Sequence, residues 1–166
     1  MANIQQLNSL SISDAHSALI RCCGSTEWVR RMVMRRPFAD EAKLCTAATE
    51  IWRGLARGDW LEAFRAHPRI GSLDALHSKF SHIARWSFEE QAGVAGAPDS
   101  IFKALVLGNR RYEAKFGFIF IVCATGKSAG EMLAILNERL QNEPEQELAV
   151  AAAEQEKITL LRLGKL

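Results

Sequence analysis

Residues 117–126 read GFIFIVCATG, and this stretch decides between a mixed fold and an all-helical one. Its β-branched and aromatic residues favour a buried strand by local propensity. No second segment of the chain resembles a pairing strand, and a single strand leaves its backbone hydrogen-bonding groups without partners. We therefore predict an irregular or helical segment that is buried by its neighbours and whose unpaired amides are available to a ligand.

Helical patterns cover most of the chain on both sides of this stretch. After it, Ser128 is expected to cap a helix that ends near Leu140, and Pro144 opens a last helix. Before it, Pro98 and Asp99 open a long helix in which Asn109 falls on the apolar side and needs a partner there. The last helix is expected to direct four residues into the core: Leu148, Ala152, Ile158 and Leu161. Helices are predicted over residues 13–22, 25–36, 40–57, 59–66, from 87, 99–116, 128–140 and from 144 nearly to the end.

Length and composition agree with one globular domain. The chain has 166 residues, of which 48% are hydrophobic and 24% charged, enough to enclose one core. We predict an all-α fold: a single domain over residues 1–166, built as an irregular bundle of about seven to nine helices. No internal repeat or linker divides it.

Charge and hydropathy exclude several classes of function. The net charge of +2 is too small for a nucleic-acid-binding protein, and no apolar run approaches the ~20 residues that cross a bilayer. The N-terminus lacks the features of a signal peptide, so we expect a cytoplasmic protein with no membrane partner. The four cysteines form no C-x-x-C motif and are expected to be free thiols.

One basic cluster stands out, formed by Arg30, Arg31, Arg35 and Arg36. Helical spacing spreads these residues around most of a helix circumference. The simple interpretation is a solvated face, and the alternative is an anion-binding or partner-binding surface.

Three further places carry residues suited to chemistry. His67 follows a predicted helix and precedes Pro68, where it either caps the helix end or transfers protons near neutral pH. Ser87 and Glu90 have the spacing of a capping box, and the same helix start would also suit an anionic ligand. Arg162 lies among leucines in the last helix, where it either reaches solvent or binds a carboxylate in bidentate fashion.

Metal and nucleotide chemistry find little support in the sequence. The four histidines are scattered, without an H-x-x-x-H or H-E-x-x-H spacing, and no Walker A or dinucleotide motif is present. We expect no metal site. A Cys–His nucleophilic pair is left open, because such residues meet only in the fold.

Three motifs in order resemble one known family, the 2-oxo-4-hydroxy-4-carboxy-5-ureidoimidazoline (OHCU) decarboxylases. They are AHPRIG at residues 66–71, SFEEQAG at 87–93 and NRRYEAKFGFIFIVCATGKS at 109–128. The pattern continues with M-L-x-x-L-x-x-R-L at 132–140 and E-x-x-K-I-x-x-L-R-L at 154–163. The resemblance therefore runs from about residue 60 to the end.

This resemblance implies an all-helical decarboxylase that forms (S)-allantoin in urate catabolism and needs neither a metal nor an organic cofactor. It implies catalytic roles for His67, Glu90 and Arg162. The implied substrate contacts are Pro68, Ser87, Gln91, Ile119, Phe120, Ile121, Val122 and Cys123. The partner is then a small-molecule substrate, and relatives suggest a homodimer.

A mechanism follows as a hypothesis from these roles. His67 would move the proton, Glu90 would hold ring or ureido N–H groups, and Arg162 would anchor an anionic group. Backbone amides of the 119–123 stretch would stabilise developing oxyanion charge. The rival interpretations are a non-catalytic helical module that binds partners through the Arg30 to Arg36 face, and hydrolysis of 5-hydroxyisourate, whose enzymes have motifs that this chain does not match.

Overall fold

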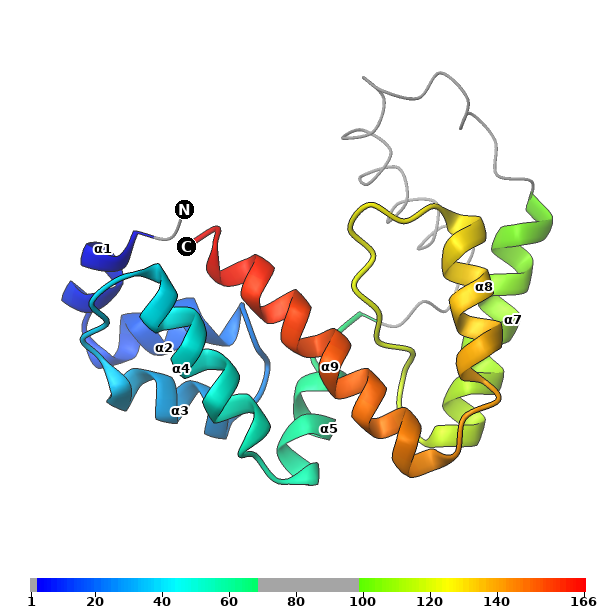
Figure 1. Cartoon of the computed structure of the whole chain (residues 1–166), viewed down its shortest axis with the longest axis horizontal. Helices are drawn as coiled ribbons and strands as arrows, with labels where there is room; N and C mark the ends of the chain where they lie inside the picture. Colours follow the sequence, from blue (N-terminus) through cyan, green and yellow to red (C-terminus); the bar gives the residue numbers. More distant parts are fainter. Residues whose placement is uncertain (1–2, 69–98) are drawn as a thin grey trace, which may run out of the picture. The chain divides into compact units, whose positions relative to one another are not determined.

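The computed structural model describes residues 3–68 and 99–166 (Figure 1). Within these two ranges the chain forms eight helices and no strand, which confirms the all-helical prediction. Its contacts divide it into two compact units, Met1–His67 with Ala151–Leu166, and Pro68–Val150. We describe each unit by itself, and the single domain remains a prediction. No helix of the described part is long and apolar enough to cross a membrane.

The first unit contains five helices and the end of a sixth. They are α1 (Ile4–Ser9), α2 (Ile12–Ile20), α3 (Thr26–Arg35), α4 (Glu41–Arg53), α5 (Arg57–Arg65) and the C-terminal part of α9 (Pro144–Leu163). The side chains of Ser11, Ser25 and Asp40 cap α2, α3 and α4 by accepting backbone N–H bonds. The helix starts predicted near residues 25 and 40 are confirmed, whereas α2 begins after Ser11, earlier than the predicted start at residue 13, and α1 was not expected.

The boundary between α4 and α5 differs from the prediction of helices over 40–57 and 59–66. Helix α4 ends at Arg53, four residues before the predicted end at Arg57. Gly54 takes the C-cap position, and its N–H reaches the carbonyls of the last turn. Helix α5 then begins at Arg57. Asp59 is not its cap but its third residue, and its carboxylate accepts the Ala56 N–H at 3.1 Å.

Three tryptophans connect the helices of the first unit. Each indole N–H donates to a backbone carbonyl: Trp28 to Ala48 at 3.1 Å, Trp52 to Ala152 at 2.9 Å, and Trp60 to Trp52 at 3.0 Å. Trp28 and Trp52 are buried, so these bonds satisfy donors that water does not reach. The bond to Ala152 fixes the end of α9 against α4.

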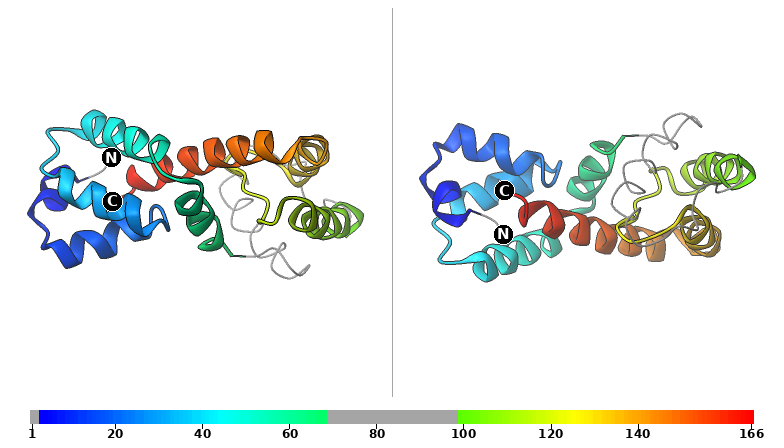
Figure 2. Two further views of the ribbon diagram at one scale, coloured as in Figure 1. Left: turned by 90° about the horizontal axis from the view of Figure 1, so that it is seen from below. Right: turned by 90° about the horizontal axis from the view of Figure 1, so that it is seen from above.

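The chain ends and the α3–α4 connection complete the first unit. The Asn3 N–H donates to the Leu166 carbonyl at 2.9 Å, so the start of α1 lies beside the C-terminal end of α9 (Figure 1 and Figure 2). Arg36 donates to the carbonyls of Leu7 and Leu10 at 2.8 and 2.9 Å, which caps the end of α1. Arg36 is therefore a structural residue rather than a member of a solvated face.

The second unit consists of α7 (Asp99–Phe116), α8 (Ala129–Arg139), the start of α9 and the segment between α7 and α8. Gly117 ends α7 with a φ of 77°, a left-handed conformation that glycine adopts without strain. Ser128 and Glu131 form the capping box of α8, as the sequence predicts. Residues 117–128 have no regular structure although most of 118–123 is buried, which confirms the irregular segment.

Candidate functional site

His67 lies just beyond the end of α5 and is half-buried. Its backbone N–H donates to the Phe64 carbonyl at 3.1 Å, which continues the last turn of the helix. Its ring lies toward α9, where Nε2 is 2.5 Å from Oε1 of Gln155. This contact fixes the orientation of the ring. Pro68 follows at an exposed position.

The Gln155 side chain continues into a buried polar chain. Its Nε2 donates to Oγ1 of Thr159 at 3.1 Å, and the Thr159 side chain acts against burial by lowering the pKa of the Cys23 thiol. Gln155 is 0% exposed and Thr159 3%, so the amide and the hydroxyl are satisfied by protein groups rather than by water. Burial raises the pKa of the Cys23 thiol to about 11, which keeps it protonated at neutral pH.

The sequence analysis did not identify Gln155 and Thr159. It placed Ile158 and Leu161 on the inner side of α9, but Ile158 is half-buried and Leu161 is 45% exposed, so that face was wrong. The buried face is indicated instead by the i, i+4 spacing of Gln155, Thr159 and Leu163, which places these three residues on one side of the helix. Leu148 and Ala152 are buried, as expected.

Arg162 is half-buried on the same face of α9, two helical turns after Gln155, or roughly 10 Å along the axis. Its Nη1 donates to the carbonyls of Arg21 and Cys22, at the end of α2, at 3.3 and 3.4 Å. These distances are long for N–H···O bonds. Arg162 and His67 thus belong to the same unit: Arg162 connects α9 to the end of α2, and His67 connects the end of α5 to α9.

The 119–123 stretch belongs to the second unit and is held by an arginine. Arg139 donates from Nη1 to the Ile121 carbonyl at 2.7 Å, and its guanidinium lies 4.7 Å from the Phe120 ring centre. Phe120, Ile121, Val122 and Cys123 are buried, and Ile119 is half-buried. The sequence correctly predicts that this stretch is buried, but it gives no indication of Arg139.

Two carbonyls of this stretch have partners, whereas several of its amides have none within the part of the chain that the structure describes. The Ile121 carbonyl accepts from Arg139, and the Cys123 carbonyl accepts from Lys127 Nζ at 2.8 Å. Among residues 3–68 and 99–166, the structure records no acceptor for the backbone N–H groups of residues 119–122. Buried amides need partners, so this stretch offers donors to a bound group.

A buried ion pair supports the Arg139 side chain. Arg139 and Glu147 are 6% and 0% exposed, and Nε of the arginine is 2.7 Å from Oε1 of the glutamate. Tyr112, which is also fully buried, donates its O–H to the same Glu147 oxygen, and Asn142 donates to the other at 2.7 Å. Burial, reinforced by the neighbouring carboxylate, raises the pKa of Tyr112 well above its usual range. Tyr112 therefore remains a hydrogen-bond donor.

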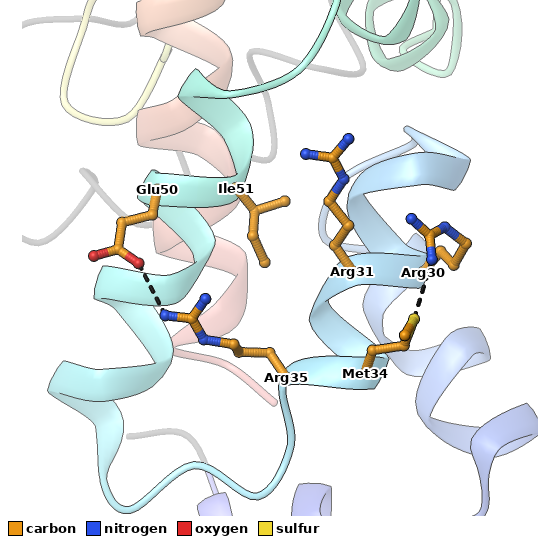
Figure 3. A pocket seen from close by; sticks show the side chains of 6 residues that line it. All are labelled: Arg30, Arg31, Met34, Arg35, Glu50 and Ile51. Carbon is orange, nitrogen blue, oxygen red and sulfur yellow. Dashed lines mark hydrogen bonds and ion pairs between the residues drawn. The ribbon is translucent and has the colours of Figure 1, made fainter.

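The arginines of α3 line a depression on the surface of the first unit (Figure 3). Their charges are compensated locally: Arg30 and Arg31 each contact Glu27 at 2.7 Å, and Arg35 contacts Glu50 at 3.1 Å. Hydrogen bonds from Arg30 and Arg31 lower the pKa of the Glu27 carboxyl to about 2. The arrangement agrees with a solvated, ion-paired face. The residues that line the depression are Arg30, Arg31, Met34, Arg35, Glu50 and Ile51.

The predicted site residues therefore fall into three groups. His67 and Arg162 lie in the first unit, whereas Pro68 and the 119–123 stretch are assigned to the second. Ser87, Glu90 and Gln91 lie outside the described residues, and their predicted roles remain predictions. The structure adds two sets of supporting residues: Gln155 and Thr159 next to His67, and Arg139 with Glu147 behind the 119–123 stretch.

Comparison with known proteins gives a consistent picture. A family model described as OHCU decarboxylase matches residues 8–164. The "Uric acid degradation bifunctional protein TTL" of Arabidopsis thaliana is 44% identical over 147 residues, which are 87% of this chain and 45% of that protein. The chain thus spans less than half the length of that bifunctional relative.

Two further relatives match over most of their own length. The "2-oxo-4-hydroxy-4-carboxy-5-ureidoimidazoline decarboxylase" of Amia calva is 32% identical over 128 residues, 77% of this chain and 73% of that protein. A crystal structure of an OHCU decarboxylase in the presence of (S)-allantoin is 39% identical, with a TM-score of 0.70. The match covers 88% of this chain and 94% of that one.

Proposed function

This chain belongs to the OHCU decarboxylase family, and we propose that it converts OHCU into (S)-allantoin and CO2 without a cofactor. The observation that carries the proposal is the family match over residues 8–164, which includes His67, Arg162 and the whole 119–123 stretch. Of the relatives named above, one is a uric acid degradation protein by its name, two are OHCU decarboxylases by theirs, and one of these two was crystallised in the presence of (S)-allantoin.

The substrate carries its own electron sink, so the chemistry needs correct positioning rather than a cofactor. The carboxyl and hydroxyl groups share ring carbon 4, next to the carbon that bears the ureido group. When the bond to the carboxylate breaks, CO2 leaves, its electron pair forms a double bond between ring carbon 4 and the ureido-bearing carbon, and the nitrogen of the former ring C=N bond takes up a proton from solvent. The hydroxyl proton is then lost as the ring carbonyl forms, and the ureido-bearing carbon gains a proton. The face that receives this proton fixes the (S) configuration.

His67 is the proposed proton carrier. Histidine titrates near neutral pH, so one imidazole can take the hydroxyl proton and deliver a proton to carbon. Its half-buried position at the end of α5 supports this role, because the ring is oriented by protein contacts and is still partly accessible. A proton delivered by one oriented ring reaches one face of the intermediate.

Each of the remaining proposed contacts binds a different polar group of the substrate. Unpaired amides of residues 119–122 are suited to oxygen atoms that gain negative charge, and Pro68 and Cys123 complete that surface. Arg162 is the proposed anchor for an anionic group, and its long bonds to carbonyls would be exchanged at small cost. Glu90, with Ser87 and Gln91, is proposed to hold the ring and ureido N–H groups.

The proposal is tested by circular dichroism of OHCU generated enzymatically immediately before mixing. OHCU decays spontaneously, so the protein-free reaction is the reference. The expected result is a faster loss of OHCU and a growing signal of one enantiomer. If the protein changes neither the rate nor the sign of the signal, the proposed activity is wrong.

Two further expectations belong with this proposal, namely a homodimer and a cytoplasmic location. Light scattering after size exclusion tests the first: the mass of one 18.5 kDa chain would contradict it and twice that mass would support it. Fractionation of the source cells tests the second.

A further inference from the structure

Gln155 occupies a position where the fold alone does not require a polar side chain. It lies on the buried face of α9 with Ala151, Ala152 and Leu163, and it is fully inaccessible to solvent. Burying an amide is unfavourable unless every polar atom finds a partner, and an apolar residue of similar volume would avoid this cost. The partners that Gln155 does find are His67 on one side and Thr159 on the other.

We infer that Gln155, held by Thr159, is a positioning residue that keeps His67 in the Nε2–H tautomer and leaves Nδ1 as the nitrogen that exchanges protons with the substrate. The inference rests on the proposed function for its catalytic part. Its structural part, the tautomer of one imidazole, does not depend on any substrate.

The hydrogen-bond directions support this tautomer. The Gln155 amide presents Oε1 to His67 and Nε2 to Thr159 at 3.1 Å. A carbonyl oxygen only accepts, so the imidazole nitrogen that faces it must carry a proton. The Thr159 oxygen accepts the amide N–H, so both polar atoms of the Gln155 side chain have a partner.

The reverse arrangement fits a proton carrier poorly. If the amide were turned around, its NH2 group would face Nε2 of His67, which would then need to be unprotonated. A histidine that carries protons must also exist as imidazolium, in which both ring nitrogens are donors. The NH2 group would then oppose an N–H group and the amide would have to rotate in every cycle. With Oε1 toward the ring, both protonation states keep the same contact.

Two other ionisable groups are coupled to this chain of hydrogen bonds. Burial raises the pKa of Cys23 to about 11, so its thiol is uncharged at neutral pH. The Arg162 guanidinium carries a fixed positive charge, and it lowers the pKa of Cys23 in opposition to burial. The Cys23 thiol therefore adds no charge beside the Gln155–Thr159 pair at neutral pH.

The first test is the long-range ¹H–¹⁵N spectrum of the protein labelled with ¹⁵N-histidine, without substrate. Above the pH at which His67 titrates, the expected pattern is a single Nε2–H tautomer. In Gln155→Met, which keeps the volume but removes the acceptor, the signals should show a mixture of tautomers. The exposed Gln146→Met on the same helix is the matched control and should resemble the unmodified protein. An Nδ1–H pattern in the unmodified protein would overturn the inference.

The second test uses kinetics. Gln155→Met should lower kcat by about 10- to 100-fold with little change in KM, since part of the acid–base contribution is lost. Gln155→Glu keeps an acceptor and adds negative charge, so it should retain more activity and move the His67 titration to higher pH. Thr159→Val should also lower kcat, but by a smaller factor than Gln155→Met.

The outcomes separate the two proposals. If the unmodified protein is inactive but shows the Nε2–H tautomer and loses it in Gln155→Met, the proposed function fails and the assignment of the tautomer stands. If activity is present but Gln155→Met changes neither kcat nor the tautomer, the role of Gln155 is refuted. If Gln155→Met does not fold, Gln155→Glu decides: an unchanged His67 titration overturns the inference.

Discussion

Gly24 sets the position of His67 through a close packing contact in the first unit. A Cβ atom at residue 24 would lie 2.2 Å from Cβ of Ala66, the residue before His67. Carbon atoms in contact lie about 3.5–4.0 Å apart, so Gly24→Ala requires a separation of roughly 1.3–1.8 Å. Both methyl groups are attached directly to the backbone, and therefore a side-chain rotation cannot relieve the overlap. The end of α5 has to move.

The expected loss in the free energy of unfolding is that of adding a methyl group where two backbone segments are already in contact, about 1–3 kcal/mol. For a chain of this size each kcal/mol lowers Tm by about 2–4 °C, so the expected decrease is roughly 2–12 °C. Because the ring of His67 moves with the end of α5, kcat should also decrease by about 10-fold or more. Calorimetry or thermal circular dichroism measures the first effect, and the allantoin assay measures the second.

Two further variants make this prediction specific. Gly58→Ala is the matched control, because a Cβ atom there meets nothing within 4 Å, and in an exposed helical position it should stabilise by about 0.4–1 kcal/mol. The double variant Gly24→Ala/Ala66→Gly removes the second methyl group and should recover most of the lost stability. If Gly24→Ala melts like the unmodified protein, or if the double variant recovers nothing, the contact does not place His67 as argued.

Other predictions concern the buried ion pair and the thiols. Arg139→Met should lower the free energy of unfolding, measured in urea, by about 3–5 kcal/mol, because Glu147 keeps a buried charge without its partner. Tyr112→Phe should lower it by about 1–3 kcal/mol. A larger loss in Tyr112→Phe than in Arg139→Met would contradict the central position of Arg139. Burial raises the pKa of Cys22 and Cys23 from 9.0 to about 11, so the folded state keeps protons that the unfolded state loses above pH 9. The free energy of unfolding should therefore decrease as pH rises from 8 to 10, and the Cys22→Ala/Cys23→Ala variant should show a smaller decrease. An equal decrease in both proteins would refute the assignment to these thiols.

Much of the fold follows from local signals in the sequence. Ser25, Asp40 and Ser128 cap helices where their position before an apolar pattern predicts it. The absence of a partner strand correctly indicates that residues 117–128 are irregular. The helix break at Gly54 was missed because Leu55 continues the apolar spacing, and only the backbone contacts of the glycine distinguish the two possibilities.

Residues of the candidate site could be predicted from the sequence only where they lie in a motif of the family. His67 and Arg162 come from motifs of the family, whereas Gln155 became visible only through its contact with His67, which is distant in the sequence. Polar residues in a helix are usually assigned to its exposed face. For α9 that rule predicted the wrong buried face, because it placed Leu161 in the core. Arg139 was missed for the same reason. Its role depends on contacts with Glu147 and with the Ile121 carbonyl, and no local sequence pattern links these three residues.

The central claim is that His67 delivers the proton that makes the product a single enantiomer. His67→Asn tests it most directly, in freshly generated OHCU followed by circular dichroism, with a melting curve to show that the variant is folded. If His67 is the proton carrier, OHCU disappears at the spontaneous rate in this variant and the allantoin formed is racemic. A folded variant that still produces one enantiomer at the rate of the unmodified protein would contradict it.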